Sequence, residues 1–154
     1  MKIGSRVAGP VGAAVSVIFL ALAAGQGRAA DSDPDFEAVK IVCGRCHSPA
    51  LFQNKPRSWE RWNDVFADMT QRGANGTDEQ LMRVTRYFLE NLTLLNVNSS
   101  PAEELEGVLG ITGEVAQSII RRREQRAFTS LADLRTVPGV DADKLEQRKS
   151  RIFF

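Results

Sequence analysis

Both cysteines of the chain and its single histidine lie within five residues, in the sequence CGRCH at positions 43–47. Residues three and four positions apart share one face of a helical turn, so we expect Cys43, Cys46 and His47 to point the same way. Two thiols placed like this can add to the vinyl groups of a haem while the imidazole binds its iron. The spacing is the attachment signature of c-type haem and predicts one covalent haem c on these three residues.

A redox-active or zinc-binding C-x-x-C pair is the alternative interpretation of the same residues. A thioredoxin-like pair lies between a strand and a helix, whereas this sequence shows no strand-like alternation of useful length. Zinc prefers four ligands, and the sequence contains no third cysteine and no second histidine. The thioredoxin-like alternative therefore lacks the strand that it needs, and the zinc-binding alternative lacks a fourth cysteine or histidine ligand.

The sixth ligand of the iron cannot be a second histidine, because the chain has only one. Apart from Met1, the methionines are Met69 and Met82, and a thioether is a known axial ligand of c-type haem. Met69 precedes a glycine-rich turn at residues 73–76 and is the predicted ligand. Met82, beside Leu81, suits packing in the core instead. An open sixth position is the third possibility.

The beginning of the chain has the pattern of an export signal. A basic start precedes an apolar run at residues 11–24 and a few small residues. We predict a signal peptide at residues 1–29, cleaved near Ala29/Ala30, and a periplasmic mature protein without a stable membrane span; an uncleaved anchor is the alternative. Loss of three basic residues with the signal takes the net charge from +1 to −2. This balance does not indicate a nucleic-acid-binding polycation.

Apolar residues at helical spacing predict an all-α fold. Three helical segments are expected first, over residues 36–43, from Ser58 and from Thr77. The last of them has a capping box, because Gln80 follows Thr77 by three positions. Trp62, in the second segment, is expected to contact the haem.

A turn-rich sequence, NVNSSP at residues 96–101, divides the rest of the chain. We predict a small cytochrome c domain at residues 30–95 and a second domain at residues 96–154. The second domain contains an imperfect duplication, in which a short helix, a turn centred on Gly110 or Gly139, and another helix recur. It carries nine Lys or Arg and nine Asp or Glu residues, so it lacks the basic balance typical of phosphate-driven binding.

The first of these domains resembles small class I cytochrome c domains, in particular the short ones that accompany periplasmic dehydrogenases. The resemblance rests on C-x-x-C-H, a tryptophan-bearing helix, a methionine before a Gly-Ala turn, and a closing helix; the matching positions are 43–47, Trp62, Met69, Gly73-Ala74 and Tyr87-Phe88-Leu89. It implies that the helix before Cys43 crosses the closing helix and that Met69 is the distal ligand.

The second domain resembles the tandem helix-hairpin-helix domain of exported competence proteins that bind DNA. Members of that family read Gly-hydrophobic-Gly at the turn, where backbone N–H groups and a helix N-terminus receive a phosphate. Here Thr112 and Asp141 replace the second glycine, and Asp141 would place a carboxylate where the phosphate approaches. The candidate contacts to DNA or to a partner protein are Gly110, Ile111, Thr112, Gly113, Arg121, Arg122 and Arg123.

Two functions follow from these patterns. The first is an exported monohaem cytochrome, an electron carrier rather than an enzyme, which exchanges single electrons with a dehydrogenase or oxidase and docks through its second domain. The second is a haem-containing protein that binds or takes up DNA through its helix-hairpin-helix domain. A peroxidase or gas sensor with an open iron is a third interpretation.

Overall fold

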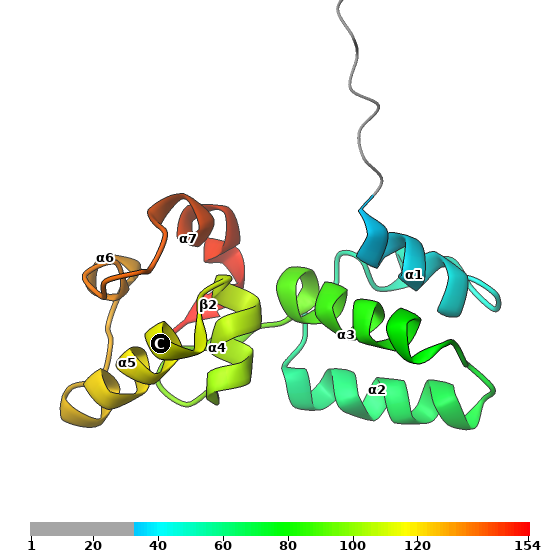
Figure 1. Cartoon of the computed structure of the whole chain (residues 1–154), viewed down its shortest axis with the longest axis horizontal. Coiled ribbons are helices and arrows are strands. Elements are labelled where there is room, and N and C mark those ends of the chain that lie inside the picture. Colours follow the sequence, from blue (N-terminus) through cyan, green and yellow to red (C-terminus); the bar gives the residue numbers. More distant parts are fainter. Residues whose placement is uncertain (1–32) are drawn as a thin grey trace, which may run out of the picture. The chain divides into compact units, whose positions relative to one another are not determined.

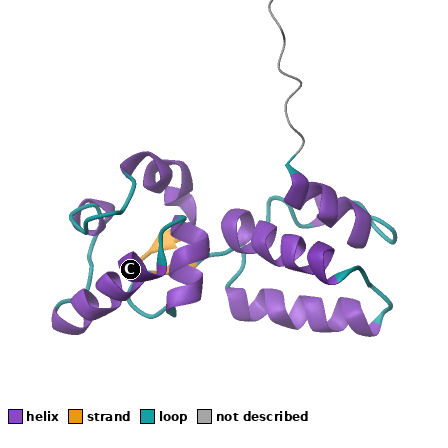
Figure 2. Ribbon diagram, in the orientation of Figure 1, coloured by secondary structure: helices purple, strands orange, loops and turns teal. Residues whose placement is uncertain are grey.

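The computed structural model describes residues 33–154, drawn as the coloured ribbon in Figure 1. The predicted signal peptide and its cleavage site lie outside the described residues. In chain order, the elements are α1 (Pro34–Val42), the 3-10 turn η1 (Pro49–Leu51), α2 (Trp59–Gln71), α3 (Asp78–Leu92), β1 (Leu95–Asn96), α4 (Ala102–Leu109), α5 (Gly113–Gln125), α6 (Leu131–Leu134), α7 (Ala142–Arg148), the 3-10 turn η2 (Lys149–Arg151) and β2 (Ile152–Phe153). Helices dominate (Figure 2), which confirms the predicted all-α fold.

Two very short strands are the part of this architecture that the sequence did not predict. β1 and β2 pair in parallel, with Leu95 opposite Ile152 and Asn96 opposite Phe153. Each strand has only two residues, so neither can show the alternation by which a strand is recognised. Their pairing joins the chain just after α3 to its C-terminal end.

The first three helices begin at polar caps. Ser58 Oγ accepts a hydrogen bond from the Arg61 amide at the start of α2. The predicted capping box at Thr77 is confirmed, since both reciprocal hydrogen bonds with Gln80 are present. α2 ends before Gly73, whose φ of 98° lies in the left-handed region that glycine adopts without strain. These caps hold the helix starts where the sequence predicts them.

An aromatic cluster fills the space between α1, α2 and α3. Trp62 is buried, and its ring lies 4.7 Å from that of Phe88 and 6.5 Å from that of Phe66. Phe52, from the loop after η1, packs against Phe88 at 5.0 Å. α1 packs against α3, for example through the rings of Phe36 and Tyr87, whose centroids are 5.3 Å apart. The implied contact between the helix before Cys43 and the closing helix is therefore present.

The last turn of α3 receives hydrogen bonds from distant side chains. The indole Nε1 of Trp62 donates to the Leu92 carbonyl at 2.9 Å. Arg151, from η2, donates to the carbonyls of Glu90 and Thr93 at 2.6 and 3.0 Å. Burial lowers the pKa of Arg151 to about 10. Carbonyls at a helix end have no partner within the helix, so these donors stabilise the end of α3.

A second core lies among α4, α5, α6 and α7. Leu105, Ile119, Phe128 and Leu145 are nearly inaccessible to solvent and pack together in it. Leu95, which the predicted boundary assigns to the preceding domain, packs in the same core. All described residues belong to one compact unit, and the division into two domains stays a prediction.

None of the helices within residues 33–154 combines the length and the apolar character needed to cross a bilayer.

Candidate nucleic-acid interface

The turn between α4 and α5 presents the N-terminus of a long helix. Gly110 has a φ of 65°, and its amide donates to the Glu106 carbonyl at 2.8 Å, which closes the end of α4. Thr112 is the N-cap of α5. The first amides of α5, those of Gly113 and Glu114, have no acceptor within the helix and lie at the positive end of its dipole. Together they attract an anion, and the Glu106 carboxylate borders the same turn, since its Oε1 lies 3.2 Å from the position that a Cβ on Gly113 would take.

Two cations from the second hairpin lie beside this first turn. Lys144 Nζ, on α7, donates to the Gly110 carbonyl at 3.2 Å. Arg148 Nη1 donates to the Val108 carbonyl at 2.6 Å. Both side chains also lie 3.1–3.2 Å from the position that a Cβ on Gly110 would take. The packing of α7 on α4 thus brings positive charge to a turn that has none nearby in the sequence.

One face of α5 continues from the turn towards Arg121. Gly113, Gln117 and Arg121 recur every four residues, and with Ser118 they line a shallow pocket of about 630 Å³. Arg121 is exposed, and it donates to the Ser118 hydroxyl at 2.9 Å. Eight residues at 1.5 Å each separate Arg121 from Gly113 by about 12 Å along the helix. A nucleic-acid backbone following this face would meet polar groups at both ends.

Arg122, the next of the three candidate arginines, is held by structural contacts. Its guanidinium donates to Asp133 at 2.5 Å and to the Thr136 hydroxyl, and it lies over the Phe128 ring at 5.0 Å. These contacts tie α5 to α6.

Arg123 is also held, by two backbone carbonyls. It donates to Val97 at 2.9 Å and to Ser100 at 2.7 Å. Of the three consecutive arginines that the sequence proposed as contacts, Arg121 alone forms neither an ion pair nor a hydrogen bond to a carbonyl among residues 33–154.

The turn before α7 differs from the first turn. Asp141 Oδ1 accepts hydrogen bonds from the amides of Asp143 and Lys144 at 2.8 and 3.0 Å. These two bonds hold the pKa of Asp141 below its ordinary value, the bond from the Lys144 amide most strongly. The Asp141 carboxylate therefore lies at the first amides of α7; that it takes the place of a phosphate stays a prediction. The amides of α7 already have an anionic partner, and the two hairpins are unequal.

The CGRCH motif follows the end of α1 and does not lie inside a helix. Cys43 is the C-cap of α1 and packs against the aromatic core, and burial raises the pKa of its thiol. Cys46 is exposed, and both thiols are free. The His47 ring lies edge-on to Phe52 at 6.2 Å, and its buried Nδ1 has no hydrogen-bond partner in the described part of the chain.

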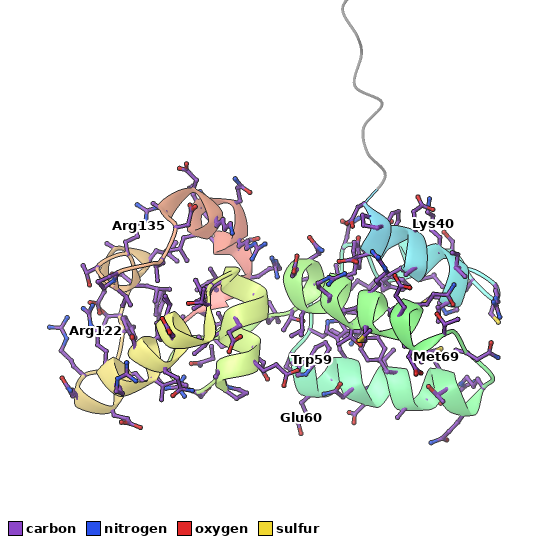
Figure 3. The ribbon with its side chains drawn as sticks, in the orientation of Figure 1. Lys40, Trp59, Glu60, Met69, Arg122 and Arg135 are labelled. Atoms are coloured by element: carbon purple, nitrogen blue, oxygen red, sulfur yellow. The ribbon has the colours of Figure 1, made fainter. Side chains whose placement is uncertain are left out.

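The methionines and tryptophans of this region have different surroundings. Trp62 is buried, and its indole N–H donates to the Leu92 carbonyl at the end of α3. Met69 is half-buried, and in Figure 3 it lies with Trp59 on the side of α2 that is turned towards α3. Met82 is 64 % exposed. The expectation that Met82 fills the core is therefore wrong, because its side chain lies on the exposed side of α3.

Known proteins match the C-terminal part of the chain. A family model described as the helix-hairpin-helix motif matches residues 90–153. This segment carries a helix-hairpin-helix motif. The match begins in the last turn of α3, ends in β2, and so includes both turns described above.

Several curated proteins are similar to this segment. Endonuclease/exonuclease/phosphatase family domain-containing protein 1 is 45 % identical over 66 residues in Homo sapiens and 46 % identical over 59 residues in Xenopus laevis. These matches cover 42 % and 38 % of this chain but only 12 % and 11 % of the relatives. ComE operon protein 1 of Bacillus subtilis is 35 % identical over 60 residues, which are 38 % of this chain and 29 % of that protein. The chain therefore corresponds to a small part of each relative. No solved structure matches.

These findings overturn the predicted haem c. Within residues 33–154, no group of three or more His, Cys, Asp or Glu side chains is placed to hold a metal ion. The comparisons point to helix-hairpin-helix proteins, and nothing in them supports a cytochrome c domain. The motif also lies in a turn, so the shared helical face assumed for its three side chains does not form. The prediction of a covalent haem on Cys43, Cys46 and His47 is therefore wrong.

Proposed function

We propose that this protein binds DNA through backbone phosphates at its first helix-hairpin-helix turn. The observation that carries the proposal is the convergence of the open end of α5 with Lys144 and Arg148 at that turn. The match to the helix-hairpin-helix motif and the similarity to ComE operon protein 1 support it. So does the resemblance to exported competence proteins.

Charge alone does not favour DNA binding, because residues 96–154 are neutral overall. The distribution of the charges matters more. Arg126 and Arg135 form ion pairs with Asp133 and Glu146, so their charges are compensated. Lys144 instead donates to a carbonyl and retains two further N–H donors. Lys144 and Arg148, which have no carboxylate partner among residues 33–154, therefore lie near the first turn, which the Glu106 carboxylate also borders.

Contacts to phosphates carry no base information. We therefore expect binding that is nearly independent of DNA sequence and that weakens as salt rises. The second hairpin contributes cations to the first turn and takes no phosphate of its own, because Asp141 occupies the start of α7.

A role as a binding protein rather than an enzyme is part of this proposal. So is export, which the pattern at residues 1–29 favours and with which the similarity to ComE operon protein 1 is compatible. The electron-carrier interpretation is not carried forward, because the comparisons favour the DNA-binding alternative.

A pair of substitutions at one residue tests the proposed contact. Gly113 is the first residue of α5, where proline fits a helix and removes only the N–H. Thr112 is already extended, with φ −80° and ψ 159°, as a residue before proline must be. Gly113→Ala is the matched control, because it keeps the N–H and also places a Cβ 3.2 Å from Glu106.

The measurement is fluorescence anisotropy of a labelled duplex titrated with each variant. Loss of one hydrogen bond to a charged phosphate predicts about tenfold weaker binding for Gly113→Pro than for Gly113→Ala. Ala142→Pro, the equivalent change at the first residue of α7, is expected to leave affinity unchanged. Equal affinity of the two Gly113 variants, or a greater loss for Ala142→Pro, would contradict the proposed contact.

A further inference from the structure

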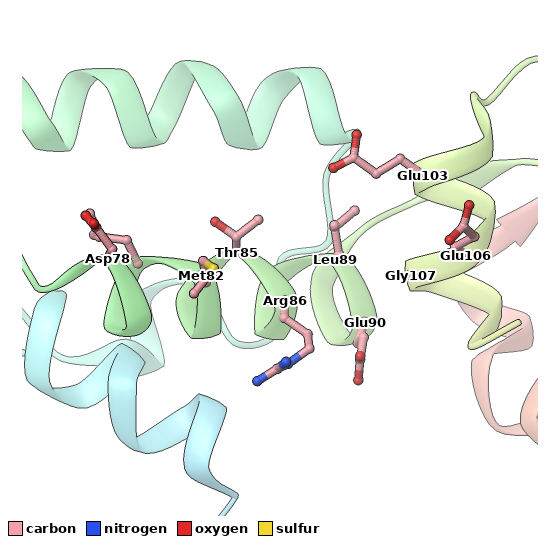
Figure 4. A pocket seen from close by; sticks show the side chains of 10 residues that line it. Asp78, Met82, Thr85, Arg86, Leu89, Glu90, Glu103, Glu106 and Gly107 are labelled. Atoms are coloured by element: carbon pink, nitrogen blue, oxygen red, sulfur yellow. The ribbon is translucent and has the colours of Figure 1, made fainter. Parts of the chain in front are cut away.

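A groove lies between the exposed side of α3 and the first turns of α4 (Figure 4). Its volume is about 620 Å³. Leu81 and Met82, on α3, are 42 % and 64 % exposed and give it an apolar surface, which continues to Leu89. Gly107 lets α4 approach, since a Cβ there would lie 3.1 Å from the Leu89 Cβ. Exposed apolar side chains along a helix are typical of an interaction surface.

The rim of this groove is acidic. Asp78, Glu90, Glu103 and Glu106 line it, and none of them forms an ion pair within residues 33–154. Among residues 33–154, Arg86 is the single cation in the lining, and its guanidinium donates to the Asp35 carboxylate of α1 at 2.5 and 2.6 Å. The groove therefore combines an apolar floor with uncompensated negative charge.

We propose that this groove binds a basic amphipathic helix of a partner protein. Leu81 and Met82 supply the exposed apolar surface, and the lining continues about 12 Å along α3 to Leu89, which is itself buried. This length suits anchors spaced by two turns on a bound helix. Lysine or arginine residues beside those anchors would meet the acidic rim. The proposal does not depend on DNA binding by the first turn.

The acidic rim also argues against other occupants. DNA and anionic lipid surfaces carry negative charge and would be repelled where Asp78, Glu90 and Glu103 line the groove. Glu106 also borders Gly113, so at the first turn its charge opposes that of Lys144 and Arg148. A second copy of this chain would bring an identical acidic rim against the first, which is unfavourable without compensating cations. A cationic, apolar helix is the occupant whose charge and shape both fit.

The test uses a synthetic peptide of leucine and lysine, with leucine at i, i+3, i+4 and i+7, as the probe. The full chain is titrated into the labelled peptide, and anisotropy gives the affinity. Met82→Glu is the decisive variant, because it removes apolar surface and adds a negative charge. Attraction by charge alone predicts tighter binding to this variant, whereas docking in the groove predicts about tenfold weaker binding.

Leu51→Glu is the matched control, since Leu51 is 57 % exposed and lies in η1 outside the groove. We expect this variant to bind like the wild type, and Glu103→Gln to bind several-fold more weakly. A peptide with glutamate in place of lysine should not bind. Failure of the wild type to bind, equal or tighter binding by Met82→Glu, or an equal loss in Leu51→Glu would overturn the proposal. So would a dimer in sedimentation that Met82→Glu dissociates.

Discussion

Replacement of Lys144 by glutamine tests whether the first turn binds phosphate through a side chain supplied by the second hairpin. Lys144, Arg148 and Arg121 are the three cations placed along the proposed contact. If each neutralises one phosphate, the slope of log affinity against log salt is about −2.7, and a fourfold rise in salt weakens binding about 40-fold. Without Lys144 the slope becomes about −1.8, and the same rise weakens binding about 12-fold.

The assay is anisotropy with a labelled duplex at several concentrations of one monovalent salt between about 50 and 200 mM. Lys149→Gln is the matched control, because Lys149 is also an exposed lysine of this segment but is paired with Glu146. We expect the control to keep the wild-type slope. If Lys144→Gln keeps the wild-type slope, or if both variants reduce it equally, the convergence of cations at the first turn has no role in binding.

Three further predictions concern the fold. Gly139→Ala should lower the free energy of unfolding, measured with urea, by about 2–4 kcal/mol, because the φ of Gly139 is 89° and a Cβ there would lie 2.5 Å from Val115. Gly73→Ala is the comparison: Gly73 has a φ of 98° with open space around it, so this variant should cost about 1–2 kcal/mol through backbone strain alone. Arg123→Ala should cost about 2–3 kcal/mol in the same assay, because two carbonyls lose a charged donor, and a loss below about 0.5 kcal/mol would contradict that role. A hydrogen bond from the Arg86 guanidinium holds the pKa of Asp35 below its ordinary value of 3.8. The contribution of the Asp35 carboxylate to stability is therefore complete above that value and is lost as pH falls through the lower, folded-state pKa. The difference in unfolding free energy between the wild type and Asp35→Asn should shrink in acid, and a constant difference would refute this.

The local signals in the sequence located the helices well. The capping box at Thr77 and the glycine turns at Gly73, Gly110 and Gly139 depend on neighbouring residues, so they can be predicted without knowledge of the tertiary structure. Asp141 is a similar case, since its carboxylate caps amides only two and three residues away. Each of these predictions concerns contacts within one turn of the chain.

The sequence could not predict which charges are free. Arg121, Arg122 and Arg123 are adjacent, yet only packing determines that Arg122 meets α6 and that Arg123 meets backbone carbonyls. Lys144 lies 34 residues from Gly110 and reaches it only because α7 packs on α4. A count of charges along the chain gives a neutral domain and cannot show this arrangement.

The haem prediction failed for a related reason. It assumed that Cys43, Cys46 and His47 share one helical face, whereas α1 ends at Val42 and the motif lies in the following turn. Spacing in the sequence describes side-chain directions only inside a regular element. Trp62, which was predicted to contact the haem, packs against its aromatic neighbours instead.

The central claim is that DNA phosphate meets the amides at the start of α5. The most direct test is an amide NMR titration of the ¹⁵N-labelled chain with a short duplex. We predict that the Gly113 and Glu114 amide resonances shift most among backbone amides, while those of Ala142 and Asp143 at the second turn stay unchanged. Unchanged Gly113 and Glu114 resonances at saturating DNA, or shifts centred on Ala142 and Asp143, would contradict the claim.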